Sequence, residues 1–397
     1  MASPRTRMRV LLLSPLPGLD PANGDVTYTE QLLADPPEGV EYVDYAAALA
    51  DGSLRERARA SEVGRTSGLP RVGAVARAAA AKAVNTARRR EWLFREPLRF
   101  FEVDADRYSL VHSHVFSVGY RGGWPPVVVS NSVAVEALYR DGLEWPDAGV
   151  RRRAGVERLL ASALHVDNST YHRHRASRFI AFTDHLRTWW VDEGIVPSED
   201  VDVVPCSVPD QPLRPLTRTP SRIGFFAGSP RVKGLDHVFA AFQVLRAQRP
   251  ALKLVVAGAE LTAEWTHVAA APGVSWTGRM SRDELVGRVL PSFDVLAHPT
   301  RFDGLPLSVL EAMSVGVPIV ASDYRALPEV LGDAGLTCVG AAALPALLAQ
   351  ALDPRRNREL SHRAQDRQRQ VYSPAATRPL LEASYRRAIA APRAVGT

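Results

Sequence analysis

The feature that most limits how this chain can fold is a repeated alternation of short β-branched runs with longer amphipathic runs. Such alternation is typical of parallel sheets joined by crossover helices, and it predicts an α/β protein of two Rossmann-like, doubly wound domains. Helices are expected in the gaps, notably over residues 25–34 and 154–164. The predicted strands are residues 8–14, 41–45, 109–114, 126–132, 178–183 and 200–205, and then 222–228, 252–258, 274–278, 294–299, 318–323 and 336–340.

One proline-rich stretch interrupts the alternation. Residues 205–220 hold five prolines in sixteen positions, and proline fits neither a helix interior nor a central strand. The length of 397 residues suits two domains of roughly 150 to 200 residues each. We therefore predict an N-terminal domain over residues 1–205, a linker over 206–220 and a C-terminal domain over 221–373. In doubly wound folds ligands bind at the carboxyl ends of the strands, so the active site is expected between the domains.

The composition is that of a soluble globular protein, with 46% hydrophobic and 23% charged residues. The two cysteines, Cys206 and Cys338, show no spacing that indicates a disulfide framework or a zinc site. The first apolar run, residues 10–13, is too short for a signal peptide or a membrane span. These features predict a cytoplasmic protein without a bound metal.

Residues 54–99 are strongly basic, with twelve lysines and arginines against four glutamates, a net charge of +8. An ordinary solvated helix face is one interpretation. The other is a peripheral contact of residues 55–99 with an anionic membrane at its inner face, or with another acidic partner. The basic positions Arg71, Arg77, Lys82 and Arg88 scatter on a helical wheel, which weakens the membrane interpretation. No nucleic-acid partner is expected.

The segment FDGLPLSVLEAM, residues 302–313, carries two acids eight residues apart, Asp303 and Glu311. Gly304 permits a tight turn, and Pro306 suits the first position of a helix that begins near Leu305 and continues through Leu307. The free amides of that first turn would attract a phosphate. Asp303 could accept hydrogen bonds from sugar hydroxyls and Glu311 from a ribose diol. A dipole-balancing acid and a surface ion pair are the ordinary alternative.

Two further patterns stand at predicted strand ends. The loop after the strand over 222–228 brings Gly228 and Ser229 together with Arg231 and Lys233, whose charges could neutralise a diphosphate. The strand over 109–114 ends in His112 and His114, which have either a structural role or a role in proton handling. No P-loop or dinucleotide-binding glycine signature is present.

Together these segments resemble the retaining family-four glycosyltransferases of the GT-B fold over nearly the whole chain. The most specific match is the acid-x7-acid segment from Asp303 to Glu311, which continues into LPEVLGDAG. Supporting matches are Lys233-Gly234, the HSH strand end, the first helix that starts at Gly24, and the C-terminal stretch SPAATRPLLEASYRRAI. In this family the last helix, here residues 374–391, packs back on the first domain.

The resemblance implies a role for each matching residue. Glu311 would bind the nucleotide ribose, Asp303 the donor sugar, and Lys233 with Arg231 the diphosphate. His114 would lie near the reacting carbon, while Gly24 and Asp25 would approach donor and acceptor. The chain departs from the family pattern at Asp303, where Glu is usual, and at Ser229, Cys206-Ser207 and Arg325-Ala326.

The resemblance also implies the reaction: a hexose-type sugar moves from a nucleotide diphosphate sugar, UDP- or GDP-linked, to an acceptor hydroxyl with retention of configuration. No metal or other cofactor is expected, and the acceptor is a glycan, a lipid or a small molecule. A nucleotide-sugar epimerase or phosphorylase on the same fold, and a non-catalytic sugar-nucleotide binding protein, are the alternatives.

Overall fold

The computed structural model describes residues 7–14, 24–56, 99–114, 123–131, 146–152, 176–304 and 306–391, with shorter pieces between 118 and 167. The chain forms two compact units. The first contains residues up to Phe182, Leu186–Val204 and Arg378–Thr397, and the second contains Thr183–His185 and Pro205–Thr377. The proline-rich stretch therefore belongs to the second unit.

The first unit is built on a six-stranded sheet in the order β10-β9-β7-β5-β1-β2, and all of its strand pairs are parallel. Its central strands are buried on both faces, as parallel strands covered by helices must be. The α/β class predicted from the alternation is confirmed. The strands are β1 (Met8–Leu13), β2 (Val40–Asp44), β5 (Leu110–His114), β7 (Val127–Asn131), β9 (Arg178–Ala181) and β10 (Val201–Val203).

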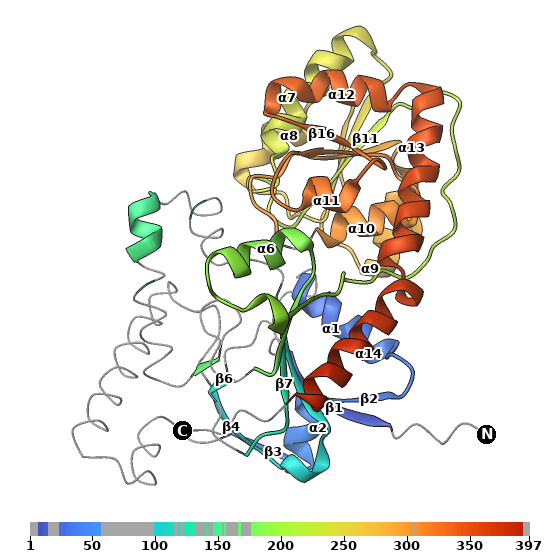
Figure 1. Cartoon of the computed structure of the whole chain (residues 1–397). Helices are drawn as coiled ribbons and strands as arrows, with labels where there is room; N and C mark the ends of the chain where they lie inside the picture. Colours follow the sequence, from blue (N-terminus) through green and yellow to red (C-terminus); the bar gives the residue numbers. More distant parts are fainter. Residues whose placement is uncertain are drawn as a thin grey trace. The chain divides into compact units, whose positions relative to one another are not determined.

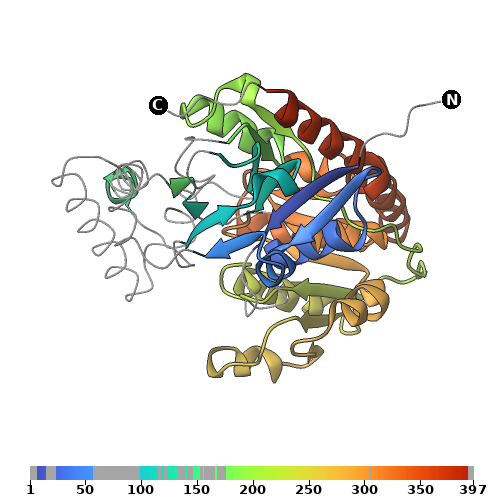
Figure 2. The same ribbon diagram turned by 90° about the horizontal axis from the view of Figure 1, so that it is seen from below.

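Helices and a small second sheet complete the first unit. The second half of α14 runs beside β1 and β2 (Figures 1 and 2), where Tyr385 on the helix contacts Tyr42 on β2. The helices are α1 (Gly24–Ala34), α2 (Tyr45–Ala50), η1 (Ala105–Arg107), α6 (Asp184–Asp192), η3 (Ser198–Asp200) and α14 (Pro374–Ala390). The small sheet has the order β3-β4-β6-β8, from β3 (Leu54–Glu56), β4 (Arg99–Val103), β6 (Val118–Gly119) and β8 (Val166–Asp167).

The second unit holds another six-stranded parallel sheet, in the order β13-β12-β11-β14-β15-β16. In chain order this is 3-2-1-4-5-6, the doubly wound order of nucleotide-binding Rossmann domains. The strand order reverses direction between β11 and β14, so the loops after these two strands lie at the switch point where such folds bind ligands. The strands are β11 (Arg222–Phe226), β12 (Lys253–Ala257), β13 (Val274–Trp276), β14 (Val295–His298), β15 (Ile319–Ser322) and β16 (Leu336–Cys338).

Helices α7 and α12 cover one face of this second sheet, and α10 and α11 cover the other (Figure 1). A continuous apolar core, including Phe225, Phe242 and Leu348, fills the space under α7 and α12. In the described residues no helix is long and apolar enough to cross a membrane. The helices are α7 (Leu235–Gln248), η4 (Ala263–Trp265), α8 (Thr266–Ala269), α9 (Arg282–Glu284), η5 (Leu285–Val289), η6 (Leu290–Ser292), α10 (Leu307–Ser314), α11 (Leu327–Leu331), η7 (Ala341–Ala343), α12 (Leu344–Ala351), α13 (Pro354–Arg367) and η8 (Gln368–Tyr372).

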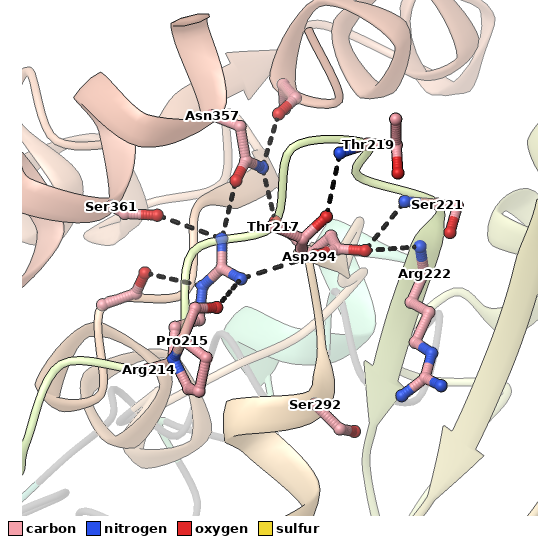
Figure 3. A network of polar contacts seen from close by, with 12 residues as sticks. Arg214, Pro215, Thr217, Thr219, Ser221, Arg222, Ser292, Asp294, Asn357 and Ser361 are labelled. Carbon is pink, nitrogen blue, oxygen red and sulfur yellow. Dashed lines mark hydrogen bonds and ion pairs between the residues drawn. The ribbon is translucent and has the colours of Figure 1, made fainter. Parts of the chain in front are cut away.

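A buried arginine fastens the proline-rich stretch to the second unit (Figure 3). The Arg214 guanidinium donates to Asn357 Oδ1 at 2.6 Å, to Ser361 Oγ at 3.1 Å and to the carbonyl of Gly316 at 3.2 Å, and it lies 3.4 Å from Asp294 Oδ1. Asp294 in turn accepts the backbone amides of Ser221 and Arg222 at 2.8 and 2.9 Å. A buried charge is tolerated only when it is paired and hydrogen-bonded in this way, so this network fixes the path of the chain into β11.

Candidate functional site

A buried carboxylate stands in the loop that follows β14. Asp303 Oδ2 lies 2.7 Å from Lys233 Nζ and 2.8 Å from His298 Nε2. Lys233 Nζ also donates to the carbonyl of Phe302 at 3.0 Å. Both side-chain contacts fall on Oδ2, and Oδ1 of Asp303 accepts no hydrogen bond from the residues that the structure describes. One carboxylate oxygen is thus anchored, and the other keeps its capacity to accept hydrogen bonds.

The protonation states of this cluster follow from its contacts. Burial opposes ionisation of Asp303, but the charge of Lys233 and the bond to His298 outweigh it and hold the pKa of the carboxyl well below its usual range. Burial lowers the pKa of His298, against the opposing effect of Asp303. The neutral imidazole therefore carries its proton on Nε2, which donates to the ionised Asp303. Within the described part of the chain, His298 Nδ1 has no hydrogen-bond partner.

Glycine at position 234 allows the loop of Lys233 to approach the end of β14. Gly234 caps α7 in the left-handed region at φ 81°, and a Cβ there would meet the carbonyl oxygen of Pro299 at 2.3 Å. A larger residue would be strained in that conformation and would also push the two loops apart. The Lys-Gly pair noted in the sequence thus has a physical reason. Glycine permits the close approach of the two loops, and lysine then contacts Asp303.

An ion pair ties the chain just before Asp303 to α7. Arg301 donates to both carboxylate oxygens of Asp236, at 2.9 and 2.6 Å, and to the carbonyl of Arg231 at 2.7 Å. Next to it, Thr300 Oγ1 donates to the carbonyl of Phe302 at 2.7 Å. These bonds order the chain immediately before Asp303.

Helix α10 begins at Leu307, slightly later than predicted. Pro306 is the residue that caps the helix, since its carbonyl accepts the amides of Val309 and Leu310 at 2.9 and 3.1 Å. It was expected one position further on, as the first helical residue. The first two amides of the helix, those of Leu307 and Ser308, have no acceptor within the helix, and Gly304 lies in the loop just before them.

Glu311 lies inside α10 and is buried, with 5% of its surface exposed. Its Oε1 lies 3.1 Å from Arg282 Nη2, at the start of α9. Burial raises the pKa of Glu311 to about 7, although the charge of Arg282 acts in the opposite direction. The surface ion pair considered as an alternative does not describe this glutamate, because a carboxylate at this depth in a helix is costly without a partner.

The two basic side chains predicted in the loop after β11 lie in different surroundings. Lys233 reaches Asp303, whereas Arg231 is largely exposed and pairs with Glu264 at 2.5 Å. Gly228 follows β11, and the carbonyl of Ser229 accepts the amide of Lys233 at 3.1 Å. Hence the loop turns back so that its lysine, and not its arginine, contacts the acid segment.

In the first unit, His114 ends β5 and is fully buried. Its Nε2 lies 3.4 Å from Asp25 Oδ1 in the first turn of α1, which begins at Gly24, and its Nδ1 lies 2.8 Å from Ser130 Oγ on β7. His114 and Asp25, which the sequence predicted as separate site residues, are therefore brought together. Three predictions fall outside the described residues: Leu305, the part of the basic segment over residues 57–98, and the helix expected over residues 154–164, of which Gly155 alone is described.

Sequence reasoning did not single out two side chains of the second unit, His298 and Arg282. His298 had a usable signal, since it lies next to the end of the strand predicted over residues 294–299 and directly precedes a proline. Arg282 had none, because its partner Glu311 is twenty-nine residues away along the chain.

Comparison with known proteins assigns the second unit. Residues 220–353 match the family model described as glycosyl transferases group 1. This unit is a group 1 glycosyltransferase domain. The matched range contains Lys233, His298, Asp303 and Glu311. A curated relative, the MMP alpha-(1->4)-mannosyltransferase of Mycolicibacterium hassiacum, is 32% identical over 206 residues, which cover 49% of this chain and 50% of that protein. The chain thus spans about half the length of that relative.

Solved structures extend the likeness from the group 1 domain to both units. The sucrose-phosphate synthase of Thermosynechococcus elongatus superposes with a TM-score of 0.63 at 17% identity, covering 97% of this chain and 100% of that chain. HepE of Anabaena, in complex with UDP and glucose, gives a TM-score of 0.60 at 14% identity, with 95% and 99% covered. With its two doubly wound sheets, the chain has the GT-B fold, as predicted.

Proposed function

We propose that this protein is a retaining glycosyltransferase that moves a hexose-type sugar from a UDP- or GDP-sugar to an acceptor hydroxyl without a metal ion. The observation that carries the proposal is the Asp303 carboxylate, anchored through Oδ2 by Lys233 and His298 and able to accept hydrogen bonds at Oδ1. It lies at the switch point of a group 1 domain, where nucleotides bind in doubly wound folds.

The donor sugar would be held by Asp303. Its Oδ1 is an ionised acceptor for one or two sugar hydroxyls, and hydrogen bonds to charged acceptors are stronger than neutral ones. Since Oδ2 is already bonded to two donors, the carboxylate cannot rotate without losing both bonds. Aspartate is shorter than the usual glutamate by one methylene group, so a sugar bound here would lie closer to β14.

The diphosphate would be held by Lys233. A lysine ammonium has three donors, and Asp303 and the carbonyl of Phe302 take two of them. The third is left for a phosphate oxygen, and the free amides at the start of α10 add to the same attraction. Arg231 would contribute only if it left Glu264, so Lys233 is the principal partner of the leaving group.

The nucleoside would be held by Glu311, whose carboxylate would accept the ribose diol. In the structure Arg282 forms an ion pair with that carboxylate. The bound state exchanges part of this ion pair for two hydroxyl donors, so ribose binding and ionisation of Glu311 are coupled.

The chemical step would break the bond between the anomeric carbon and the phosphate oxygen and build negative charge on the diphosphate. Lys233 and the helix amides stabilise that charge, an effect of about 3 to 4 kcal/mol for a well-placed donor. The departing phosphate would take the proton of the acceptor hydroxyl on the same face, which keeps the anomeric configuration. The acceptor, a glycan, lipid or small molecule, would be bound by the first domain, where His114 and Asp25 meet.

The known relatives support the transferase part of this proposal. The Mycolicibacterium hassiacum relative is named a mannosyltransferase, and the Anabaena neighbour was solved with UDP and glucose. For this chain they support a nucleotide sugar as donor, and they leave the choice between UDP and GDP to experiment.

Incubation with radiolabelled UDP- and GDP-sugars, with and without acceptor extracts, tests the proposal. We expect label to move into an acceptor fraction, equally in the presence of EDTA, and the product to keep the donor's anomeric configuration by NMR. Isomerisation of the donor without acceptor would indicate an epimerase. Release of sugar phosphate with free phosphate would indicate a phosphorylase, and binding without turnover a sugar-nucleotide binding protein.

A further inference from the structure

A chain of buried hydrogen bonds runs through the first unit from α14 to α1. Tyr42 Oη on β2 lies 2.8 Å from Tyr385 Oη on α14, which lies 2.6 Å from His112 Nδ1 on β5. His112 Nε2 lies 2.8 Å from Ser130 Oγ on β7. Ser130 Oγ is shared, because it also lies 2.8 Å from His114 Nδ1.

The far end of this chain meets a carboxylate. His114 Nε2 lies 3.4 Å from Asp25 Oδ1, a long separation, and among the described residues this nitrogen has no hydrogen-bond partner, so Asp25 acts on it through its charge. A nitrogen without a proton would place a lone pair against a carboxylate oxygen, whereas an N–H points a partial positive charge at it. Asp25 therefore favours the form of His114 that carries its proton on Nε2.

That single choice sets the direction of every other bond. If His114 Nδ1 is bare, Ser130 must donate its only proton to it. Ser130 then has to accept from His112 Nε2–H, which leaves His112 Nδ1 bare to accept from Tyr385. The Tyr385 oxygen in turn accepts from Tyr42. These hydrogen bonds could also all run in the opposite direction, and the negative charge of Asp25 favours the direction described.

The central part of the chain is isolated from water. Tyr385, His112, Ser130 and His114 are each fully buried. Burial lowers the pKa of His112 to about 3, so that this imidazole is neutral at physiological pH. Burial also raises the pKa of Tyr385. Hydrogen bonds in such surroundings polarise one another, and a change at one end is felt at the other.

We propose that Ser130, His112 and Tyr385 are positioning residues that hold the His114 ring in its Nε2–H form, with Nε2 on the side of Asp25. Loss of the Tyr385 hydroxyl leaves the buried Nδ1 of His112 without a hydrogen-bond donor. His112 and Ser130 connect Tyr385 to His114 in this network. The C-terminal helix thereby contributes to the site through hydrogen bonds. The part that concerns catalysis rests on the proposed function, whereas the proton positions do not.

Nitrogen-15 NMR of histidine-labelled, ligand-free protein tests the proton positions directly, because the one- and two-bond couplings distinguish a protonated ring nitrogen from a bare one. His112→Gln and His114→Gln identify the two signals. We expect both rings in the Nε2–H form in the wild type. In Asp25→Asn both should gain the opposite form, even though His114 is the histidine of the two that lies beside Asp25. Adding Ser130→Ala to Asp25→Asn should remove the response of His112.

A wild-type His114 protonated on Nδ1, or a His112 signal that ignores Asp25→Asn, would overturn the proposal. The wild-type result decides even if a variant fails to fold.

Turnover gives the second readout. Tyr385→Phe should lower kcat about tenfold at a nearly unchanged KM, the loss that follows from one unsatisfied buried acceptor. The matched control is Tyr108→Phe, which removes another buried tyrosine hydroxyl of the same unit, one bonded to Ser53 and outside this chain of bonds. Equal losses in the two variants would mean a general effect on packing. If no glycosyl transfer is found but the NMR result holds, the proposed function fails and the hydrogen-bond chain stands.

Discussion

In the second domain Asp303 is fixed by charge, through a lysine and a histidine that share one of its oxygens. In the first domain His114 is fixed by a neutral chain of hydroxyl groups and a second imidazole, and a carboxylate lies only at its end. Each arrangement suits a different demand. Charge that builds on a diphosphate is best stabilised by fixed charges and donors, whereas one ring held in one orientation needs only hydrogen bonds.

The difference also concerns robustness to substitution. A buried charge that loses its partner is left uncompensated, and the energetic penalty is several kcal/mol. When a neutral chain loses one hydroxyl, the group left without a partner costs about 1 to 3 kcal/mol of stability. The second domain should therefore show larger effects than the first, and the following variants test that order.

Lys233→Ala should have the largest effect. We expect turnover with a nucleotide sugar to fall about 100-fold or more, with a much smaller change in ground-state binding, because charge on the diphosphate grows towards the transition state. Steady-state kinetics measure both. The control is Arg231→Ala in the same loop, which removes an exposed arginine paired with Glu264 and should change turnover only a few-fold. A Lys233→Ala enzyme within about twofold of wild type would remove Lys233 from the leaving-group site.

His298→Leu should have an intermediate effect. The variant deprives Asp303 Oδ2 of one donor, a hydrogen bond to a charged group, and kcat/KM for the donor should fall about tenfold or somewhat more. His298→Gln can again place an N–H near Oδ2 and should recover most of that loss. Equal activity of the Leu and Gln variants would show that His298 serves packing rather than the orientation of Asp303.

The pH dependence of nucleotide binding should be smaller. The pKa of Glu311 is about 7 in the ligand-free protein, and ribose hydroxyls bind its ionised form. Affinity for a bare nucleoside diphosphate should therefore rise roughly tenfold from pH 6 to pH 8. Calorimetric titration of wild type and Glu311→Gln separates this effect from ionisation of the ligand's own phosphate, which is common to both. Parallel pH profiles would contradict the coupling.

The same raised pKa has a consequence for stability. A carboxyl whose folded-state pKa lies above its unfolded value contributes stability below the unfolded pKa and loses it as pH rises through the folded value. The ligand-free wild type should therefore lose stability between about pH 5 and pH 8 relative to Glu311→Gln, as thermal melts of the two proteins would show.

Much of the second domain could be predicted from the sequence, because its signals are local. Its strands and their parallel pairing follow from regular alternation, and Asp303, Gly304, Pro306 and Glu311 lie within nine residues of one another. A charged residue next to a glycine at a strand end is informative even without a partner. The start of α10 was misplaced because Pro306 caps the helix instead of opening it, a distinction that depends on backbone angles and not on residue type.

The first domain was less predictable for a physical reason. Its hydrogen-bond chain joins Tyr42, His112, Ser130 and Tyr385, and Tyr385 lies more than 270 residues beyond His112. Tyrosine and serine are ordinary in strands and helices, so neither stands out by type. Arg282 in the second domain escaped notice in the same way, because only the folded chain brings it to Glu311.

The claim that the nucleotide is held by the second domain is tested most directly by calorimetric titration of UDP and GDP into two variants, Glu311→Ala and His114→Ala. For the preferred nucleotide, Glu311→Ala should weaken binding about 10- to 100-fold, the loss of a charged hydrogen-bond partner worth about 1.5 to 3 kcal/mol. His114→Ala should leave the affinity within about twofold of wild type. Unchanged binding in a folded Glu311→Ala protein, with loss of binding in His114→Ala, would contradict the account.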